Sequence, residues 1–198
     1  MNARSLSRTR TIIAFKLVMS VCPFALAEPT EKTEDNSTTA ISSKIEETKA
    51  GELILVETVL IAAPVDKVWA AYTTTAGYTS WAAPVAEIDF RVGGTIRTHY
   101  DKDAKIGDPK TNTVRILNYV PRKVLTLQAD VSDNWPDIMK EQAEYLYNVI
   151  LFEKISPNST RLTSYGLGYR DNPEMRNLMK FFVRANKGLY ANLLKAVE

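Results

Sequence analysis

The last part of the chain, residues 171–198, repeats apolar residues at the spacing of an α-helix. Asp171 or Asn172 can cap its first turn, and Pro173 follows at a position where its missing N–H costs nothing. One face carries Met175, Leu178, Met179, Phe182, Leu189, Leu193 and Val197, and the other carries Arg176, Lys180, Arg184 and Lys187. A long helix with one apolar side must pack against another element, so the rest of the chain has to supply the surface that covers it.

Upstream of this helix the apolar residues alternate with polar ones, which is typical of strands. Pro64 opens a first helix, and residues 74–81 predict a short second one. Strands are predicted over 53–61, 84–92, 95–101, 112–120, 123–130, 143–154 and 160–169, most of them separated by turns that contain Gly or Pro. We therefore expect an α+β fold, in which a curved antiparallel sheet of about seven strands wraps around the C-terminal helix and two short helices follow the first strand.

The N-terminal segment has the layout of a secretory signal. A basic start leads into an apolar run that ends in Ala25-Leu26-Ala27, and cleavage is expected after Ala27. Lys16 interrupts the run, which argues against a membrane-spanning helix, although a retained anchor is the alternative. The predicted organisation is a signal peptide at 1–27, a disordered polar linker at 28–50 and one domain at 51–198, in a protein exported to the periplasm or the cell exterior, without stable membrane insertion after cleavage.

Composition narrows the classes of function. The chain has 25 Lys and Arg against 23 Asp and Glu, but four of the basic residues and none of the acidic ones lie in the predicted signal. The mature protein would be slightly acidic and has no basic stripe with interleaved aromatic residues, so no nucleic-acid partner is expected. The one cysteine, Cys22, also falls in the signal. The segment 101–108 resembles a calcium loop but lacks the acid at its fifth position, so neither a metal nor a cofactor is expected.

The one histidine, His99, is a candidate catalytic base if its side chain faces the helix. A two-residue turn at Gly93-Gly94 would place it opposite Ile88, on the apolar side of the sheet. A three-residue turn over 92–94 would place it opposite Glu87 and would keep the apolar residues of both strands together. Because the second register matches like with like on both faces, we expect it, with His99 on the outer face.

Six short segments carry a family resemblance and occur in order within residues 52–198: APVDKVWAAYT, GYTSW, DFRVGG, TIR, NYVPRKVLTLQ and NSTRLT. Together with the amphipathic end, they resemble the START-like superfamily, also called SRPBCC or helix-grip, to which the birch pollen allergen belongs. More narrowly, they resemble the branch named after the activator of heat-shock protein 90 ATPase. The resemblance implies a sheet that curls around the long helix, with a cavity that often holds an apolar or amphipathic ligand. The expected export argues against a chaperone cofactor, because that chaperone and its ATP are cytosolic.

The candidate ligand-binding residues are those expected around such a cavity. Ser164, Gly166 and Gly168 form a stripe of small residues that would leave space beneath the helix. The predicted ligand-binding set is Phe90, Ile96, Thr98, Trp81, Trp135, Ser164, Gly166, Met175, Met179 and Phe182. The alternative is a fully packed core, which apolar residues at helical spacing also indicate.

Three functions remain open on this basis. The first is non-catalytic binding of a small hydrophobic or amphipathic ligand. The second is a cyclase-, dehydratase- or hydrolase-like enzyme in the same cavity, which a buried carboxylate with a raised pKa beside a tyrosine hydroxyl would favour. The acids within residues 130–144 could supply such a group, although a polar loop anchored by Trp135 is the simpler interpretation, and no catalytic residue is assigned. The third is a protein-interaction module with an exposed apolar patch and an unknown partner.

Overall fold

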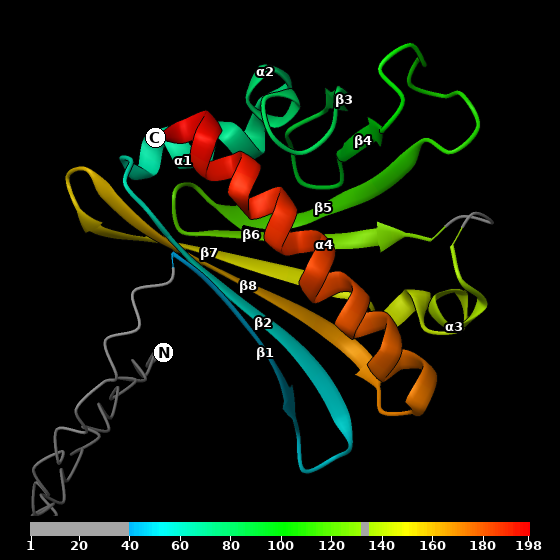
Figure 1. Cartoon of the computed structure of the whole chain (residues 1–198). Helices are drawn as coiled ribbons and strands as arrows, with labels where there is room; N and C mark the ends of the chain where they lie inside the picture. Colours follow the sequence, from blue (N-terminus) through cyan, green and yellow to red (C-terminus); the bar gives the residue numbers. More distant parts are fainter. Residues whose placement is uncertain (1–39, 132–134) are drawn as a thin grey trace, which may run out of the picture. The chain divides into compact units, whose positions relative to one another are not determined.

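The computed structural model describes residues 40–131 and 135–198 (Figure 1). One antiparallel sheet of eight strands, in the order β1-β2-β8-β7-β6-β5-β4-β3, carries the fold. The strands are β1 (Ile41–Glu47), β2 (Glu52–Ile61), β3 (Val85–Ile88), β4 (Thr95–His99), β5 (Asn112–Val120), β6 (Val124–Asp130), β7 (Tyr147–Ser156) and β8 (Ser159–Arg170). The helices are α1 (Val65–Thr73), α2 (Thr75–Thr79), α3 (Asp137–Lys140), the 3-10 turn η1 (Ala143–Tyr145) and α4 (Pro173–Val197). The expected α+β helix-grip architecture is confirmed.

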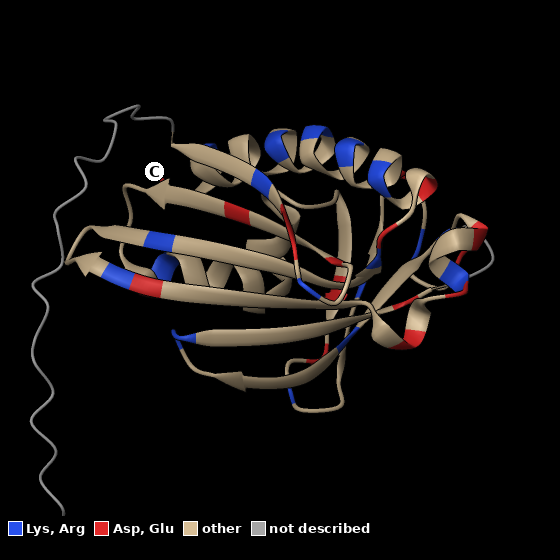
Figure 2. Cartoon of the chain, turned by 90° about the horizontal axis from the view of Figure 1, so that it is seen from below, with Lys and Arg blue, Asp and Glu red and all other residues tan. Residues whose placement is uncertain are grey.

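The C-terminal helix α4 crosses the inner face of the sheet (Figure 1). Its N-terminus is capped by Asn172, whose Oδ1 accepts a hydrogen bond from the Met175 amide at 2.8 Å. Buried side chains follow along one side, and Figure 2 shows the basic residues along the length of the helix. The four predicted basic positions of this helix are all exposed, so the predicted division of α4 into an apolar and a basic face is correct. No helix of residues 40–131 and 135–198 has the length and apolar character needed to cross a membrane.

The interior under α4 consists of two apolar clusters. The larger one joins α1 and the middle strands to the end of α4, and contains Val59, Val68, Ile116, Leu162 and Leu193 among its fully buried residues. The smaller one joins the start of β2 to the start of α4, and consists of Leu53, Leu55, Met175 and Met179. The space between these two clusters is where the candidate site lies.

Strand β1 was not expected from the sequence, because its residues belong to the predicted linker. The segment ISSKIEE alternates half-buried and exposed residues and pairs with β2 over its whole length. Ile41 packs against the larger cluster and Ile45 against the smaller. An edge strand needs an apolar residue only at alternate positions, so its overall composition stays polar. The linker prediction is therefore wrong for residues 41–47, whereas residues 1–39, including the predicted signal, lie outside the described residues.

The register of β3 and β4 corrects the prediction for His99. Ile88 pairs with Ile96, Glu87 with Arg97 and Val85 with His99, so neither predicted register occurs. The connection is longer than expected, with a first hydrogen bond from the Asp89 amide to the Thr95 carbonyl at 2.9 Å. The observed pairing differs from the three-residue turn by two positions, and therefore keeps the same residues on each face.

His99 lies on the side of β4 opposite to Ile96, as expected, but its side chain is only 7% exposed. The loop 100–111 covers it: the Asp101 amide donates to Nδ1 at 3.0 Å, and Nε2 lies 3.0 Å from the Pro109 carbonyl oxygen. Because Nδ1 accepts, the proton of the neutral ring resides on Nε2 and is donated to Pro109. The predicted pairing of His99 with Glu87 is wrong, and the side chain anchors a loop instead.

Candidate functional site

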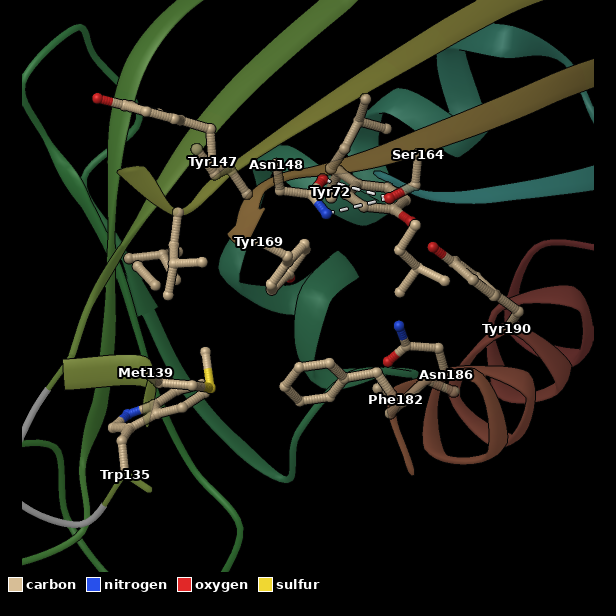
Figure 3. Close-up of a pocket in the computed structure, with 18 of the residues that line it drawn as sticks. Tyr72, Trp135, Met139, Tyr147, Asn148, Ser164, Tyr169, Phe182, Asn186 and Tyr190 are labelled. Atoms are coloured by element: carbon tan, nitrogen blue, oxygen red, sulfur yellow. Dashed lines mark hydrogen bonds between the residues drawn. The ribbon is translucent and has the colours of Figure 1, made fainter. Parts of the chain in front are cut away.

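A cavity of about 270 Å³ lies between α4 and the sheet and is partly open to solvent (Figure 3). Its aromatic lining is Tyr72, Tyr78, Trp81, Trp135, Tyr147, Tyr169, Phe182 and Tyr190. Its aliphatic lining is Leu55, Val114, Leu127, Ala129, Met139, Leu146, Ile150 and Leu189, and the rest is Asn148, Ser164, Gly166 and Asn186. Among the described residues, the wall contains no charged side chain. Such a largely apolar wall with a few polar groups is the usual make-up of a small-molecule site.

Small residues of β8 make room for the cavity. Ser164 and Gly166 point toward α4 from the centre of the sheet, where β8 pairs with β2 on one side and β7 on the other. A side chain at position 166 would place its Cβ 3.1 Å from the ring of Tyr169 and 3.4 Å from the Cβ of Leu55. The sequence therefore keeps a glycine where a larger residue would crowd both neighbours and reduce the open volume.

Gly168, the third member of the small-residue stripe, has a different role. Its φ angle is +87°, and a Cβ at this position would lie 1.7 Å from the carbonyl oxygen of Tyr145. The glycine allows η1 to lie directly against β8, just before β7 begins. It is thus needed for the close approach of two backbones rather than for the cavity itself.

The polar end of the cavity is built around a buried carboxylate. Glu57 is 1% exposed and occupies the inner row of β2, between Leu55 of the smaller cluster and Val59 of the larger. Its Oε2 accepts hydrogen bonds from Asn186 Nδ2 at 2.9 Å and from the Tyr190 hydroxyl at 3.1 Å. Its Oε1 accepts a longer bond from the Ser43 hydroxyl at 3.4 Å. Asn186 and Tyr190 both line the cavity, so the carboxylate lies one side chain behind its wall.

A second polar pair lies beside the first. Asn148 of β7 and Ser164 of β8 exchange hydrogen bonds, Asn148 Nδ2 donating at 3.1 Å and the Ser164 hydroxyl donating back at 3.3 Å (Figure 3). Ser164 also pairs in register with Glu57 across β8 and β2. The polar groups of three neighbouring strands and one helix therefore gather at one end of an otherwise apolar cavity.

Burial controls the protonation of this region. It raises the pKa of Glu57, while the hydrogen bonds from Asn186, Tyr190 and Ser43 lower it in part. Burial and then the charge of Glu57 raise the pKa of Tyr169 to about 12 and also raise the pKa of Tyr190. Tyr169 and Tyr190 are therefore neutral hydroxyl groups near neutral pH.

The opposite end of the cavity is apolar. Trp135, Met139, Phe182 and Tyr169 lie around it (Figure 3). Trp81 is held in the wall by a hydrogen bond from its Nε1 to the Ala71 carbonyl at 3.0 Å. The indole nitrogen of Trp135, by contrast, is buried without a hydrogen-bond partner in the described part of the chain.

Half of the predicted ligand-binding residues lie in this wall, namely Trp81, Trp135, Ser164, Gly166 and Phe182. The other half pack elsewhere in the interior and do not line the cavity. Phe90 lies edge-on to Trp69 at 5.7 Å, in an aromatic group with Tyr119. Ile96 and Thr98 are buried in β4, and Met175 and Met179 are fully buried in the smaller cluster.

The residues that sequence reasoning missed include Glu57, Asn186, Tyr190, Tyr72 and Met139. One signal was present for Glu57. It is the single acid in the inward row of LILVETVLI, where every second neighbour is apolar. A lone acid in such a row indicates either an error in the strand register or a carboxylate with dedicated partners.

The described acids of the 130–144 connection do not line the cavity. Asp130, Asp137, Glu141 and Glu144 are absent from its wall, and Asp133 lies outside the described residues. Within residues 40–131 and 135–198 no group of His, Cys, Asp and Glu has an arrangement that could hold a metal ion.

Comparison with known proteins gives one family and several similar structures. A family model described as Activator of Hsp90 ATPase homolog 1-like protein matches residues 62–197, more than half of the chain. No curated protein matches the chain. The solution structure of the Aha1 dimer from Colwellia psychrerythraea is 17% identical and covers 73% of this chain and 92% of its own, with a TM-score of 0.54.

Two further structures extend the likeness. A crystal structure of a protein from Nitrosomonas europaea is 20% identical and covers 77% of this chain and 97% of its own, with a TM-score of 0.57. A norcoclaurine synthase point mutant of Thalictrum flavum, in complex with a transition-state analogue, is 14% identical and covers 79% of this chain and 96% of its own, with a TM-score of 0.50. At these identities the likeness is one of fold.

Proposed function

Because the chain belongs to the family of Activator of Hsp90 ATPase homolog 1-like proteins, whose fold generally serves as a ligand-binding or interaction module, we propose that it binds a small hydrophobic or amphipathic ligand. The proposed site is the cavity between α4 and the sheet. The observation that carries the proposal is the cavity of about 270 Å³, which combines an aromatic wall with one polar end. A packed core would instead have filled this volume with side chains.

The cavity volume limits the size of the ligand. An engineered apolar cavity of about 150 Å³ in another protein takes up benzene, so the volume here fits a molecule of roughly twelve non-hydrogen atoms. An aromatic or bicyclic body would contact the apolar wall, and a single polar group would reach the polar end. Long acyl chains would need the open side of the cavity as well.

Two measurements test the proposal. Native mass spectrometry of gently purified protein should show an adduct that organic extraction removes. A dye that fluoresces on apolar contact should bind the wild-type protein with one-to-one stoichiometry. Retention of neither an extractable molecule nor dye would contradict ligand binding.

A matched pair of variants locates the binding. Ala129 lines the cavity from β6, whereas Thr126 lies on the outer face of the same strand, three residues earlier. Ala129→Phe should fill part of the volume and weaken dye binding by roughly tenfold or more. Thr126→Phe adds a ring to the other face and should leave binding unchanged. Equal effects of the two substitutions would place the dye elsewhere.

Catalysis in the same cavity is the second candidate, and one observation favours it. Glu57 is a buried carboxylate with a raised pKa that accepts a hydrogen bond from a tyrosine hydroxyl. It ranks second because Glu57 stands behind Asn186 and Tyr190 rather than in the wall. Chemical change of a bound ligand in the wild-type protein, lost in Glu57→Gln with ligand affinity retained, would favour catalysis over binding alone.

A protein-interaction role has weaker support. The exposed large apolar side chains are spread over several elements, among them Leu60 of β2, Val120 of β5, Leu151 of β7 and Phe181 of α4. Val120 and Leu151 flank Val124 in one row on the outer face of the sheet, whereas Phe181 lies on α4, so these side chains do not all share one face.

We also propose export of the protein, on the basis of its first 27 residues. The mature protein would then begin at Glu28. N-terminal sequencing of protein recovered from fractionated cells tests this, and a cytoplasmic chain that retains Met1–Ala27 would contradict it.

A further inference from the structure

The polar end of the cavity offers an unequal supply of hydrogen-bond donors and acceptors, and Glu57 is the cause. An ionised carboxylate only accepts hydrogen bonds, so each neighbour that contacts it must use a donor. Asn186 donates one amide N–H to Oε2, and Tyr190 donates its single O–H to the same atom. Neither donor is then free for a molecule in the cavity.

What these two residues still present to the cavity is mainly oxygen. With one amide N–H committed to Glu57, Asn186 keeps its second N–H and its carbonyl Oδ1, and in Figure 3 this oxygen lies on the side of Phe182. Tyr190 keeps the lone pairs of its hydroxyl oxygen. In the pair of Asn148 and Ser164, the Ser164 O–H and one Asn148 N–H are used, and the second Asn148 N–H remains. Among these four residues, the lone pairs left on oxygen therefore outnumber the N–H donors left on the two amides.

Charge acts in the same direction. No side chain of the described cavity wall carries a charge, and no Lys or Arg within residues 40–131 and 135–198 forms an ion pair with Glu57. The carboxylate thus sets a negative potential at the polar end, and its field is weakly screened because it is buried. A ligand carboxylate placed there would face like charge and an excess of oxygen acceptors that cannot donate to it.

Resting on the proposed binding function, we propose that the polar group of the ligand is a hydrogen-bond donor, an ammonium or a hydroxyl, and that the site rejects carboxylates. An ammonium group gains from both the acceptors and the negative potential, whereas a hydroxyl gains from the acceptors alone. A fatty-acid type of head group gains from neither. Glu57 acts on this choice as a positioning residue, through Asn186 and Tyr190, because it does not itself line the cavity.

Three probes with one body and different head groups test this inference. Naphthalen-2-ylmethylamine, naphthalen-2-ylmethanol and 2-naphthoate are close in size to the cavity, and their binding can be measured by isothermal titration calorimetry near neutral pH. The amine is expected to bind about tenfold or more tightly than the naphthoate, with the alcohol between them. Naphthoate binding that equals or exceeds amine binding would overturn the inference while leaving the binding function intact. Failure of all three probes to bind would overturn the binding function as well.

Substitutions test whether Glu57 causes the preference for an ammonium head group. Glu57→Gln keeps the shape and removes the charge, and should reduce the preference for amine over alcohol to about twofold or less. Glu52→Gln removes the same charge from an exposed position of the same strand and should leave the preference unchanged. Tyr190→Phe removes one acceptor and should weaken amine and alcohol binding more than naphthoate binding. An unchanged preference in Glu57→Gln, with the fold intact by circular dichroism, would refute the role of this residue.

Discussion

Replacement of Glu57 by glutamine should stabilise the protein, and the gain should depend on pH. Burial raises the pKa of this carboxyl above its ordinary value of 4.5, so ionisation at neutral pH costs free energy of folding. Glutamine can reproduce the contacts without the charge. Its carbonyl oxygen can accept from Asn186 and Tyr190 in place of Oε2, and its amide can donate to the Ser43 hydroxyl in place of Oε1.

The sign and size follow from proton linkage. A carboxyl with a raised folded-state pKa holds its proton longer in the native than in the unfolded state. Native stability is therefore greatest below the unfolded value of 4.5 and falls as the pH rises toward the folded-state value. Each unit by which the pKa is raised corresponds to about 1.4 kcal/mol of lost stability above that value. Glu57→Gln removes this loss.

Urea unfolding, followed by tryptophan fluorescence and by circular dichroism at several pH values, measures the difference. Near pH 8 the variant should be more stable than the wild type by about 1 kcal/mol or more, and near pH 4 the two should agree within about 0.5 kcal/mol. Glu52→Gln serves as the control and should show no such dependence. A variant that is less stable near pH 8, or a difference that does not change with pH, would refute the reasoning.

Three further predictions concern other parts of the fold. Gly188→Ala should stabilise α4 by about 1 kcal/mol in urea unfolding, because a Cβ there meets nothing within 4 Å; a destabilised variant would contradict this. His99→Ala should cost about 1–3 kcal/mol and speed hydrogen exchange of the Asp101 amide, while probe binding stays unchanged; a large loss of binding with the fold retained would show that His99 serves the site. Trp135→Phe should reduce the ligand-induced change in tryptophan fluorescence and leave the part due to Trp81, whereas Trp69→Phe should preserve the whole change, since Trp135 and Trp81 line the cavity and Trp69 does not.

Features with strong periodicity could be predicted from the sequence. The face of α4 that holds Met175, Met179 and Leu193 follows from helical spacing, and the order of strands and turns follows from alternation. These patterns result from local geometry and burial, which act over short stretches of the chain. Strand β1 was not predicted because Ile41 and Ile45 are the only apolar residues on its inner face, and an edge strand can be polar at its other positions.

Features that depend on contacts between distant segments could not be predicted. Glu57 meets Asn186 and Tyr190, which lie more than a hundred residues further along the chain. Methionine and aromatic residues at helical spacing are equally suited to a cavity wall and to a packed cluster. The sequence therefore could not indicate that Phe182 lines the cavity whereas Met179 is packed in the smaller cluster. The turn between β3 and β4 likewise depends on its backbone path rather than on the presence of Gly93 and Gly94 alone.

The most direct measurement of the central claim is the position of a bound probe. Intermolecular nuclear Overhauser effects between naphthalen-2-ylmethanol and the protein report which side chains it contacts. Contacts are expected with Met139 and Phe182 at the apolar end, and with Tyr190 at the polar end. Contacts with Leu60 and Leu151, on exposed parts of β2 and β7, or the absence of any intermolecular effect, would contradict a ligand site between α4 and the sheet.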